Sequence, residues 1–160
     1  MRRFRVYVDT SVIGGCFDEV FTEDSKAFLD RARSGKIVIL VSDIVIAELE
    51  TAPPEVRNLL PGLPSDAVEF VPFTKEAEEL RDAYIAAGVV GRTQIDDAAH
   101  VATATVSHAD AIVSWNFRHI VRLDKIKAYN AVNLLHGYGI LTILSPKEVV
   151  DHGSEDEEQV

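Results

Sequence analysis

The chain has 160 residues and a mass of 17.6 kDa, which is enough for one domain to bury a core without a disulfide or a metal. With 47% apolar and 26% charged residues and a single cysteine, it is neither an intrinsically disordered protein nor a disulfide scaffold. The net charge of −10 argues against broad nonspecific binding to nucleic acids, which depends on cationic side chains, but it does not exclude an enzyme whose acids hold cations.

Strand-like and helix-like stretches alternate along the chain. In order, we expect a strand at 4–8, a helix at 22–34, a strand at 37–41, helices at 42–51 and 55–60, a strand at 68–71, helices at 74–87 and 94–107, a strand at 111–114, a short helical segment after Asn116, a helix at 125–135 and a strand at 140–144. This alternation predicts a three-layer α/β/α sandwich with a central, mostly parallel sheet.

Several of the expected helices begin at a capping residue. Ser42, Thr74 and Thr93 each stand just before a helical pattern, as N-cap residues do. A last helix is expected after Ser145, because Ser145 and Glu148 have the spacing of a capping box with proline at the first helical position.

We expect no targeting or membrane-spanning segment in this sequence. No apolar run approaches the roughly 18 residues of a membrane helix, and the first residues lead straight into a strand pattern without the features of a signal peptide. We therefore expect a cytoplasmic protein. The last ten residues hold five acids and no Lys or Arg, so we expect a folded domain over 1–150 and an acidic disordered tail over 151–160.

Polar residues at the carboxyl ends of parallel strands are the candidate site, because ligands of such sheets bind there. Asp9 directly follows the first strand, and Thr10 and Ser11 add two hydroxyls, although all three residues also suit a helix N-cap. Glu48 lies in an otherwise apolar stretch, where a charge is costly unless it is paired, bound to a cation or on a partly exposed helix face.

Two adjacent acids open the helix expected at 94–107. Asp96 stands three residues after Thr93, in the acidic position of a capping box, and acids in a first turn also favour the helix dipole. Asp97 is explained less easily in this way. The next turn on its side is apolar, so we expect Asp97 to point toward the sheet end.

A hydroxyl and an amide follow the apolar strand residues 111–113. Ser114 and Asn116 should reach the same edge of the sheet, although Asn116 also suits a helix N-cap. With the carboxylates, they form an expected group of hard oxygen ligands of the kind that suits Mg²⁺ or Mn²⁺. The sequence shows no matching cluster of His or Cys, so zinc is not expected.

Four short blocks stand out in this order: YVDTSVIGG at 7–15, SDIVIAELE at 42–50, DDAAHVATA at 96–104 and ADAIVSWNFRHI at 109–120. In this order and spacing they resemble the PIN-domain ribonucleases, in particular the VapC-like toxins of type II toxin–antitoxin pairs. The stretch at 125–146 also resembles one branch of that family, so the likeness covers the chain apart from its acidic tail.

The resemblance implies three metal ligands. They are Asp9, Glu48 and Asp97, binding directly or through water. Asp97 is favoured over Asp96 because the family's acid precedes a helix histidine by three residues, and His100 fits that spacing.

Asn116 stands where the resemblance implies a fourth acid. An amide brings no charge, which weakens the case for a second tightly held metal. Asp110 cannot replace it, because it begins a strand and should lie at the opposite end of the sheet. We expect Asn116 to orient a water or a phosphate, and Ser11 or Ser114 to donate to the groups that hold the metal.

The activity that the resemblance implies is Mg²⁺- or Mn²⁺-dependent endonucleolytic hydrolysis of RNA, which leaves 5′-phosphate and 3′-hydroxyl ends. It also implies a cognate antitoxin whose Arg or Lys enters the acidic crevice, and a homodimer, for which the segment 84–90 and the helix at 74–87 are the expected apolar surface. A basic cluster either binds RNA phosphates or forms a solvated helix face; it consists of Arg118, His119, Arg122, Lys125 and Lys127.

Other residues and functions have simpler explanations. We expect Trp115 and Cys16 to be core residues and His100 to be a satisfied structural histidine. A phosphatase of the haloacid-dehalogenase type needs a second Asp two residues after Asp9, and Ser11 stands there. A PIN-like module that binds RNA or a partner without turnover stays an alternative because of Asn116.

Overall fold

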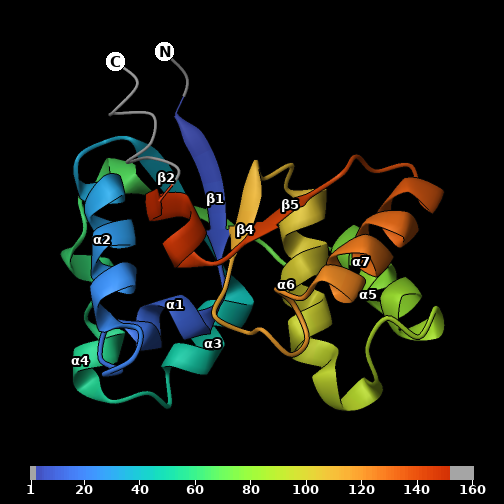
Figure 1. The fold of residues 1–160 in the computed structure, drawn as a ribbon, viewed down its shortest axis with the longest axis horizontal. Coiled ribbons are helices and arrows are strands. Elements are labelled where there is room, and N and C mark those ends of the chain that lie inside the picture. Colours follow the sequence, from blue (N-terminus) through green and yellow to red (C-terminus); the bar gives the residue numbers. More distant parts are fainter. Residues whose placement is uncertain (1–2, 152–160) are drawn as a thin grey trace.

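The computed structural model describes residues 3–151 and contains a five-stranded sheet in the order β3-β2-β1-β4-β5. Every neighbouring pair of strands is parallel. The strands are β1 (Phe4–Val8), β2 (Ile37–Ser42), β3 (Val68–Val71), β4 (Ala111–Val113) and β5 (Thr142–Leu144). Figure 1 shows β1 in the middle of the sheet, and the predicted parallel arrangement is confirmed.

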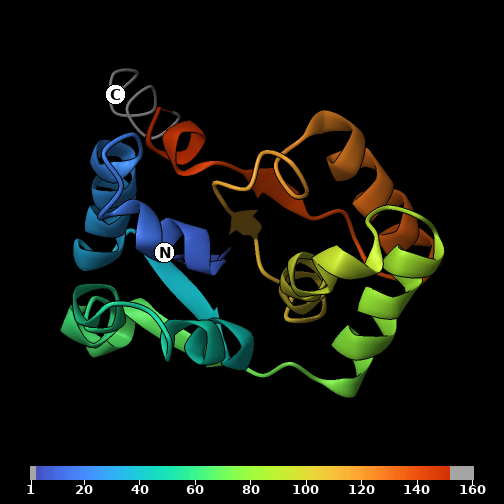
Figure 2. The ribbon, with the colours of Figure 1, turned by 90° about the horizontal axis from the view of Figure 1, so that it is seen from below.

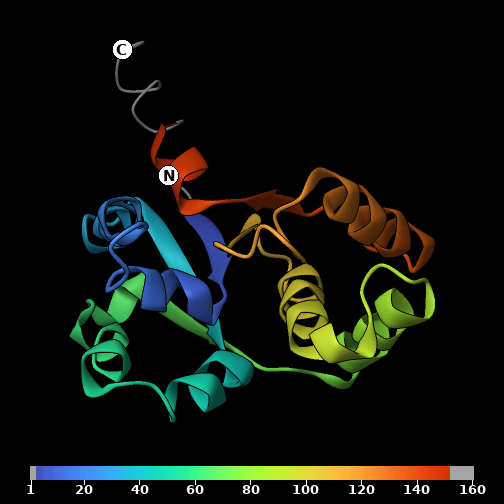
Figure 3. The ribbon, with the colours of Figure 1, turned by 60° about the horizontal axis from the view of Figure 1, so that its bottom comes forward.

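Helices cover both faces of the sheet, which confirms the predicted three-layer α/β/α sandwich. Four helices pack on one face: α1 (Thr10–Gly15), α2 (Thr22–Arg33), α3 (Asp43–Leu49) and α4 (Pro54–Arg57). Three pack on the other: α5 (Lys75–Ala86), α6 (Ile95–Val106) and α7 (Leu123–Leu135). Figures 2 and 3 show these two groups on opposite sides of the strands. No helix within residues 3–151 is long and apolar enough to cross a bilayer.

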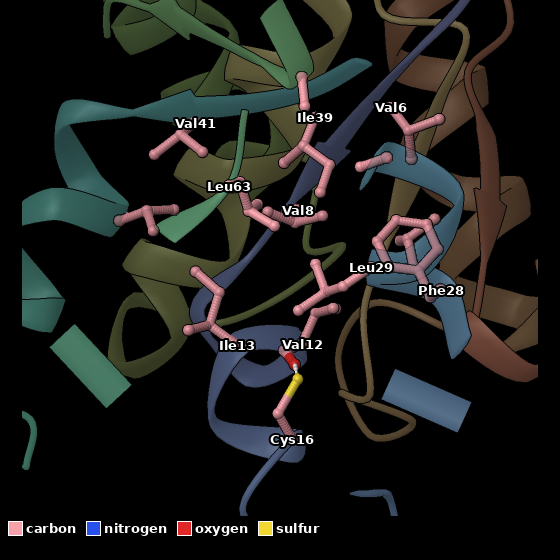
Figure 4. Close-up of a cluster of buried hydrophobic side chains, with 14 of the residues drawn as sticks. Val6, Val8, Val12, Ile13, Cys16, Phe28, Leu29, Ile39, Val41 and Leu63 are labelled. Carbon is pink, nitrogen blue, oxygen red and sulfur yellow. Dashed lines mark hydrogen bonds between the residues drawn. The ribbon is translucent and has the colours of Figure 1, made fainter. Parts of the chain in front are cut away.

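The central strands supply side chains to two separate cores. Val6 and Val8 of β1 join Ile39 of β2 in the core beneath α1 and α2 (Figure 4). Tyr7 and Leu40 point to the opposite face, into the core beneath α5, α6 and α7. Successive strand residues alternate between faces, so burial of both faces accounts for the uniformly apolar pattern of β2.

Two expectations about apolar surfaces had different outcomes. Cys16 is buried in the core of Figure 4, as predicted. The dimer surface expected over 84–90 is only partly available, because three of its apolar residues are not exposed. Tyr84, Val89 and Val90 are all buried in the chain's own second core, so they offer no surface to a partner.

The predicted capping residues are confirmed for three helices. Ser42 Oγ accepts the backbone N–H of Val45 at 3.4 Å, and Thr74 starts α5 in the same way. Ser145 and Glu148 form the reciprocal bonds of a capping box at the start of a helix over 146–151. The rest of the acidic tail predicted at 151–160 lies outside the described residues.

The capping role predicted for Thr93 is wrong. A 3-10 turn over Arg92–Gln94 intervenes, with Gly91 as its N-cap, and α6 begins only at Ile95. The Thr93 hydroxyl accepts a hydrogen bond from the Gln94 amide instead of a backbone N–H. Asp96 therefore does not occupy the acidic position of a capping box.

The short helix predicted after Asn116 is absent from the described residues, which form a single turn there. The Asn116 carbonyl accepts the N–H groups of Ile120 and Val121, and the backbone at Arg122 is then extended, with φ −148° and ψ 132°. That extended residue ends the turn, and α7 starts immediately after it.

Gly15 lies where α1 meets α2 and the segment after β4. A Cβ atom on Gly15 would come within 2.6 Å of Ser25 Oγ and 2.8 Å of Trp115 Nε1, two atoms that hydrogen-bond to each other. We predict that Gly15→Ala destabilises the fold by about 1–3 kcal/mol through overpacking.

Gly14→Ala is the matched control, because nothing lies within 4 Å of its added Cβ and alanine favours a helix by up to about 1 kcal/mol. Urea denaturation compares the two variants. Equal free energies of unfolding would show that the contact at Gly15 does not constrain the packing of Trp115. The burial of Trp115 itself confirms the prediction that it is a core residue.

Candidate functional site

The strand order reverses between β1 and β4. From β1 the chain continues to β2 and β3 on one side and returns through β4 on the other. Ligands of parallel sheets bind outside the carboxyl ends of strands at such a reversal. The residues that follow these two strands, Asp9 and Ser114, meet at this point.

Asp9 is buried, with 5% of its surface exposed, at the N-cap position of α1. Its side chain makes no capping hydrogen bond, so the N-cap explanation is wrong for Asp9. Instead, Ser11 Oγ donates to Oδ1 at 2.5 Å and Ser114 Oγ donates to Oδ2 at 2.6 Å. Both oxygens of the carboxylate are therefore held in fixed directions.

The two serines are themselves held by backbone groups that follow β4. Ser11 Oγ accepts the N–H of Trp115 at 2.9 Å, and Ser114 Oγ accepts the N–H of Asn116 at 2.9 Å. The structure thus places both predicted donors against Asp9. The bonds from Ser114 to Asp9 and from Trp115 to Ser11 join residues that are 105 and 104 positions apart in the sequence.

Glu48 is carried to the same region by α3. Its Oε1 lies 2.8 Å from Nε2 of the buried His100. Partial burial raises the pKa of Glu48, but the hydrogen bond from His100 and the neighbouring Thr10 hydroxyl outweigh it, so the net pKa lies below the ordinary value. Within the described residues, the buried Thr10 Oγ1 makes no hydrogen bond of ordinary geometry.

Asp97 is half-buried on the first turn of α6, whereas Asp96 is exposed. Burial raises the pKa of the Asp97 carboxyl, and the charge of Asp9 raises it further. The Asn116 side chain lies beside Asp97 and opposes this shift. The structure therefore separates the two adjacent acids and brings Asp97 to the site.

The three acids are within electrostatic reach of one another. Burial is the main cause of the raised pKa of Asp9, and the charge of Glu48 adds to it, just as Asp9 acts on Asp97. Buried carboxylates that repel one another are stabilised by a cation. The buried Thr10 hydroxyl beside Glu48 adds another hard oxygen, so the donor set fits Mg²⁺ or Mn²⁺.

No three His, Cys, Asp or Glu side chains within residues 3–151 are arranged as a ready-made metal cage. In proteins, Mg²⁺ usually keeps several waters and takes one or two carboxylates.

Asn116 uses its side-chain oxygen locally. Oδ1 accepts the backbone N–H of His119 at 2.8 Å and that of Arg118 at 3.2 Å, so it stabilises the turn as a capping residue would. Its amide group remains for Asp97. Asp110 lies at the opposite end of the sheet, as predicted, and accepts the N–H of Arg5 at 2.8 Å.

The basic cluster after Asn116 is partly committed to the fold. Lys125 Nζ donates to the Val89 carbonyl at 2.6 Å, and Arg122 Nε pairs with Asp124 at 2.8 Å. Arg118 is exposed next to the turn at Asn116. Within this cluster, Arg118 is also the basic residue nearest in sequence to Asn116.

Sequence reasoning did not identify the hydrogen bonds that join three polar residues at the site, and it did not name Tyr7 at all. His100 is satisfied as predicted, but its partners are Glu48 and the Tyr7 hydroxyl, and Tyr7 in turn bonds to Ser42. One signal was present in the sequence. A tyrosine in a buried strand needs a partner for its hydroxyl, and Tyr7 stands only two residues before Asp9.

The family model of the PIN domain matches residues 6–126. The chain belongs to the PIN-domain family. The match covers β1 to the start of α7 and includes all four positions of the acidic site. A sequence comparison with curated proteins found no match.

Solved structures with a similar fold include VapBC2 from Rickettsia felis bound to a DNA fragment from their promoter, with a TM-score of 0.58 and 15% identity over 89% of this PIN domain chain and 98% of the other. FitAB bound to an IR36 DNA fragment has a TM-score of 0.55 and 15% identity, over 89% of this chain and 95% of the other. FitAcB from Neisseria gonorrhoeae has a TM-score of 0.53 and 16% identity, over 88% of this chain and 97% of the other. At these identities the likeness establishes the shared fold.

Proposed function

We propose that this PIN domain is a divalent-metal-dependent endoribonuclease and the toxin of a toxin–antitoxin pair. The observation that carries the proposal is Asp9. This carboxylate is buried where the strand order reverses, held by two hydroxyls, and within electrostatic reach of Glu48 and Asp97. PIN domains are generally nucleases, and the donor set suits the cation that such a reaction needs.

The carboxylates of Asp9, Glu48 and Asp97 would hold Mg²⁺ or Mn²⁺ directly or through water. A bound cation of this kind acidifies a water and stabilises charge on phosphoryl oxygens. Ser11 and Ser114 keep Asp9 in one orientation, so little reorganisation is needed when the substrate arrives.

Two residues after β4 complete the proposed site. The Asn116 amide keeps Asp97 turned toward the site, and the exposed guanidinium of Arg118 is available to an RNA phosphate. The negative charge of the chain is compatible with an RNA substrate because the bound cation offsets the charge of the acids.

We also propose a cognate antitoxin as the partner. The solved structures of similar fold include VapBC2 and FitAB, each bound to DNA. An antitoxin side chain of Arg or Lys entering the acidic crevice would neutralise the repulsion among the carboxylates as a metal does. A homodimer stays a prediction, and it needs a surface other than the buried residues of 84–90.

Incubation of the protein with a structured RNA tests the function. We expect cleavage with Mg²⁺ or Mn²⁺ and none with EDTA, and products whose 5′-phosphate ends allow ligation. Cleavage that persists in EDTA, or products with 2′,3′-cyclic phosphate ends, would exclude the proposed chemistry.

A binding module without turnover is the second candidate. It is favoured by Asn116, whose oxygen is engaged by two backbone N–H groups and which brings no charge to the fourth position. RNA that is retained but stays intact, to the same extent with Mg²⁺ and with EDTA, would support this alternative.

A further inference from the structure

A row of hydrogen-bonded side chains lies behind the acids. Ser42 Oγ and Tyr7 Oη are 2.7 Å apart, Tyr7 Oη and His100 Nδ1 are 2.7 Å apart, and His100 Nε2 and Glu48 Oε1 are 2.8 Å apart. The row joins the end of β2, then β1, α6 and α3. Tyr7 and Ser42 are fully buried and His100 is nearly so, which leaves these bonds shielded from water.

One placement of the hydrogen atoms gives every member of this row a partner. In this placement, Ser42 Oγ accepts the backbone N–H of Val45 and donates its own proton to Tyr7 Oη. Tyr7 then donates its single proton to Nδ1 of His100.

In this placement, His100 is neutral and has one tautomer. With Nδ1 accepting from Tyr7, the ring proton stands on Nε2 and is donated to the Glu48 carboxylate. The opposite tautomer would place the lone pair of Nε2 against a carboxylate oxygen, and the two would repel each other.

We propose that Tyr7 and Ser42 are positioning residues that set the tautomer of His100 and thereby orient Glu48 for the divalent cation. The inference rests on the proposed function, because the cation is that of the nuclease site. His100 holds Oε1, which leaves Oε2 of Glu48 to face the cation or a water bound to it. The ordering of a metal-binding group by a hydrogen-bonded neighbour is common in metal sites.

Tyr7→Phe tests the inference because it removes one hydroxyl and keeps the ring. We expect the affinity for Mn²⁺ to fall by roughly 10-fold, as is usual when a group that orients a metal ligand is lost. Calorimetric titration of the purified protein in the absence of RNA measures this affinity. We also expect the ¹⁵N chemical shifts of the His100 ring, which report the tautomer, to move away from a protonated Nε2 and a bare Nδ1.

Tyr84→Phe is the matched control. Tyr84 is also fully buried, and its hydroxyl bonds to Asn133 between α5 and α7, apart from the acids. It should lose a comparable hydrogen bond and keep the Mn²⁺ affinity and His100 shifts of the wild type.

His100→Gln supplies a second arm, because its amide can donate to Glu48 without any tautomer to select. In this background Tyr7→Phe should cause no further loss of Mn²⁺ affinity, whereas two independent effects would multiply. A wild-type protein that binds no Mn²⁺ would overturn the nuclease proposal and this inference with it. A wild-type protein that binds Mn²⁺, with Tyr7→Phe equal to Tyr84→Phe, would overturn the inference alone.

Discussion

Asp97→Asn should reduce metal-dependent RNA cleavage by more than about 100-fold, because even residues that only orient metal ligands cost roughly 10–100-fold when they are lost. Asp96→Asn should stay close to wild type. The two substitutions remove the same charge from adjacent positions of α6. Only Asp97 is half-buried and coupled to Asp9, whereas Asp96 is exposed.

The measurement is kcat/KM on a fluorescent RNA over a range of Mg²⁺ concentrations. We expect Asp97→Asn to need more Mg²⁺ for its residual activity and Asp96→Asn to follow the wild-type curve. The reverse ranking, with Asp96→Asn inactive and Asp97→Asn active, would place the site one residue earlier on the helix and contradict the geometry described above.

Asp9→Asn should abolish cleavage and yet make the metal-free protein more stable. Burial raises the pKa of Asp9 above its ordinary value, so its charged form opposes folding at neutral pH. Asparagine keeps the shape of the side chain. Its oxygen still accepts from one of the two serines, and the hydroxyl of the other can rotate to accept from its NH₂ group. For a chain of this size, each kcal/mol gained raises the melting temperature by about 2–4 °C.

The sign of the pH dependence follows from the direction of this shift. A carboxyl whose pKa is higher in the folded than in the unfolded state binds more protons when folded, so stability falls as the pH rises above 3.8 through the raised value. The gap in stability between Asp9→Asn and wild type should therefore close at low pH and be largest at neutral pH.

Thermal melts in EDTA across this pH range measure the effect, with the exposed Asp96→Asn as a control that should show no such gap. Added Mg²⁺ should raise the melting temperature of the wild type and leave that of Asp9→Asn unchanged. A metal-free Asp9→Asn that is less stable than wild type at pH 7 would show that the protein itself satisfies the Asp9 charge, without a cation.

The parallel sheet could be predicted because its signals are local. The uniformly apolar β2 and the caps at Ser42 and Thr74 are readable from a few neighbouring residues. The cap predicted at Thr93 was wrong because Gly91 starts a 3-10 turn before it. The local sequence does not decide which of these two residues begins the helical segment. The helix predicted after Asn116 was wrong for a related reason. The Asn116 side chain caps a single turn, and the chain becomes extended at Arg122 instead of continuing as a helix.

The acids of the site could be proposed from their positions after strands and on helix faces, but not their partners. Asp9 is held by Ser114, which is 105 residues away, and Glu48 by His100, which is 52 residues away. Such pairs form only when the sheet and helices are assembled. No spacing in the sequence specifies them, which is why the partners of His100 could not be named and Tyr7 was not considered.

The central claim is that Asp9, Glu48 and Asp97 share one divalent cation beyond the carboxyl ends of β1 and β4. A crystal of the protein grown with Mn²⁺, with anomalous diffraction measured at the manganese edge, tests it directly. The account predicts a peak at that place, bonded to a carboxylate oxygen of Asp9 or Asp97 at about 2.0–2.2 Å, with the remaining acid bound directly or through water. Manganese peaks confined to other acidic surfaces, such as the one formed by Glu76, Glu79 and His136, would contradict it.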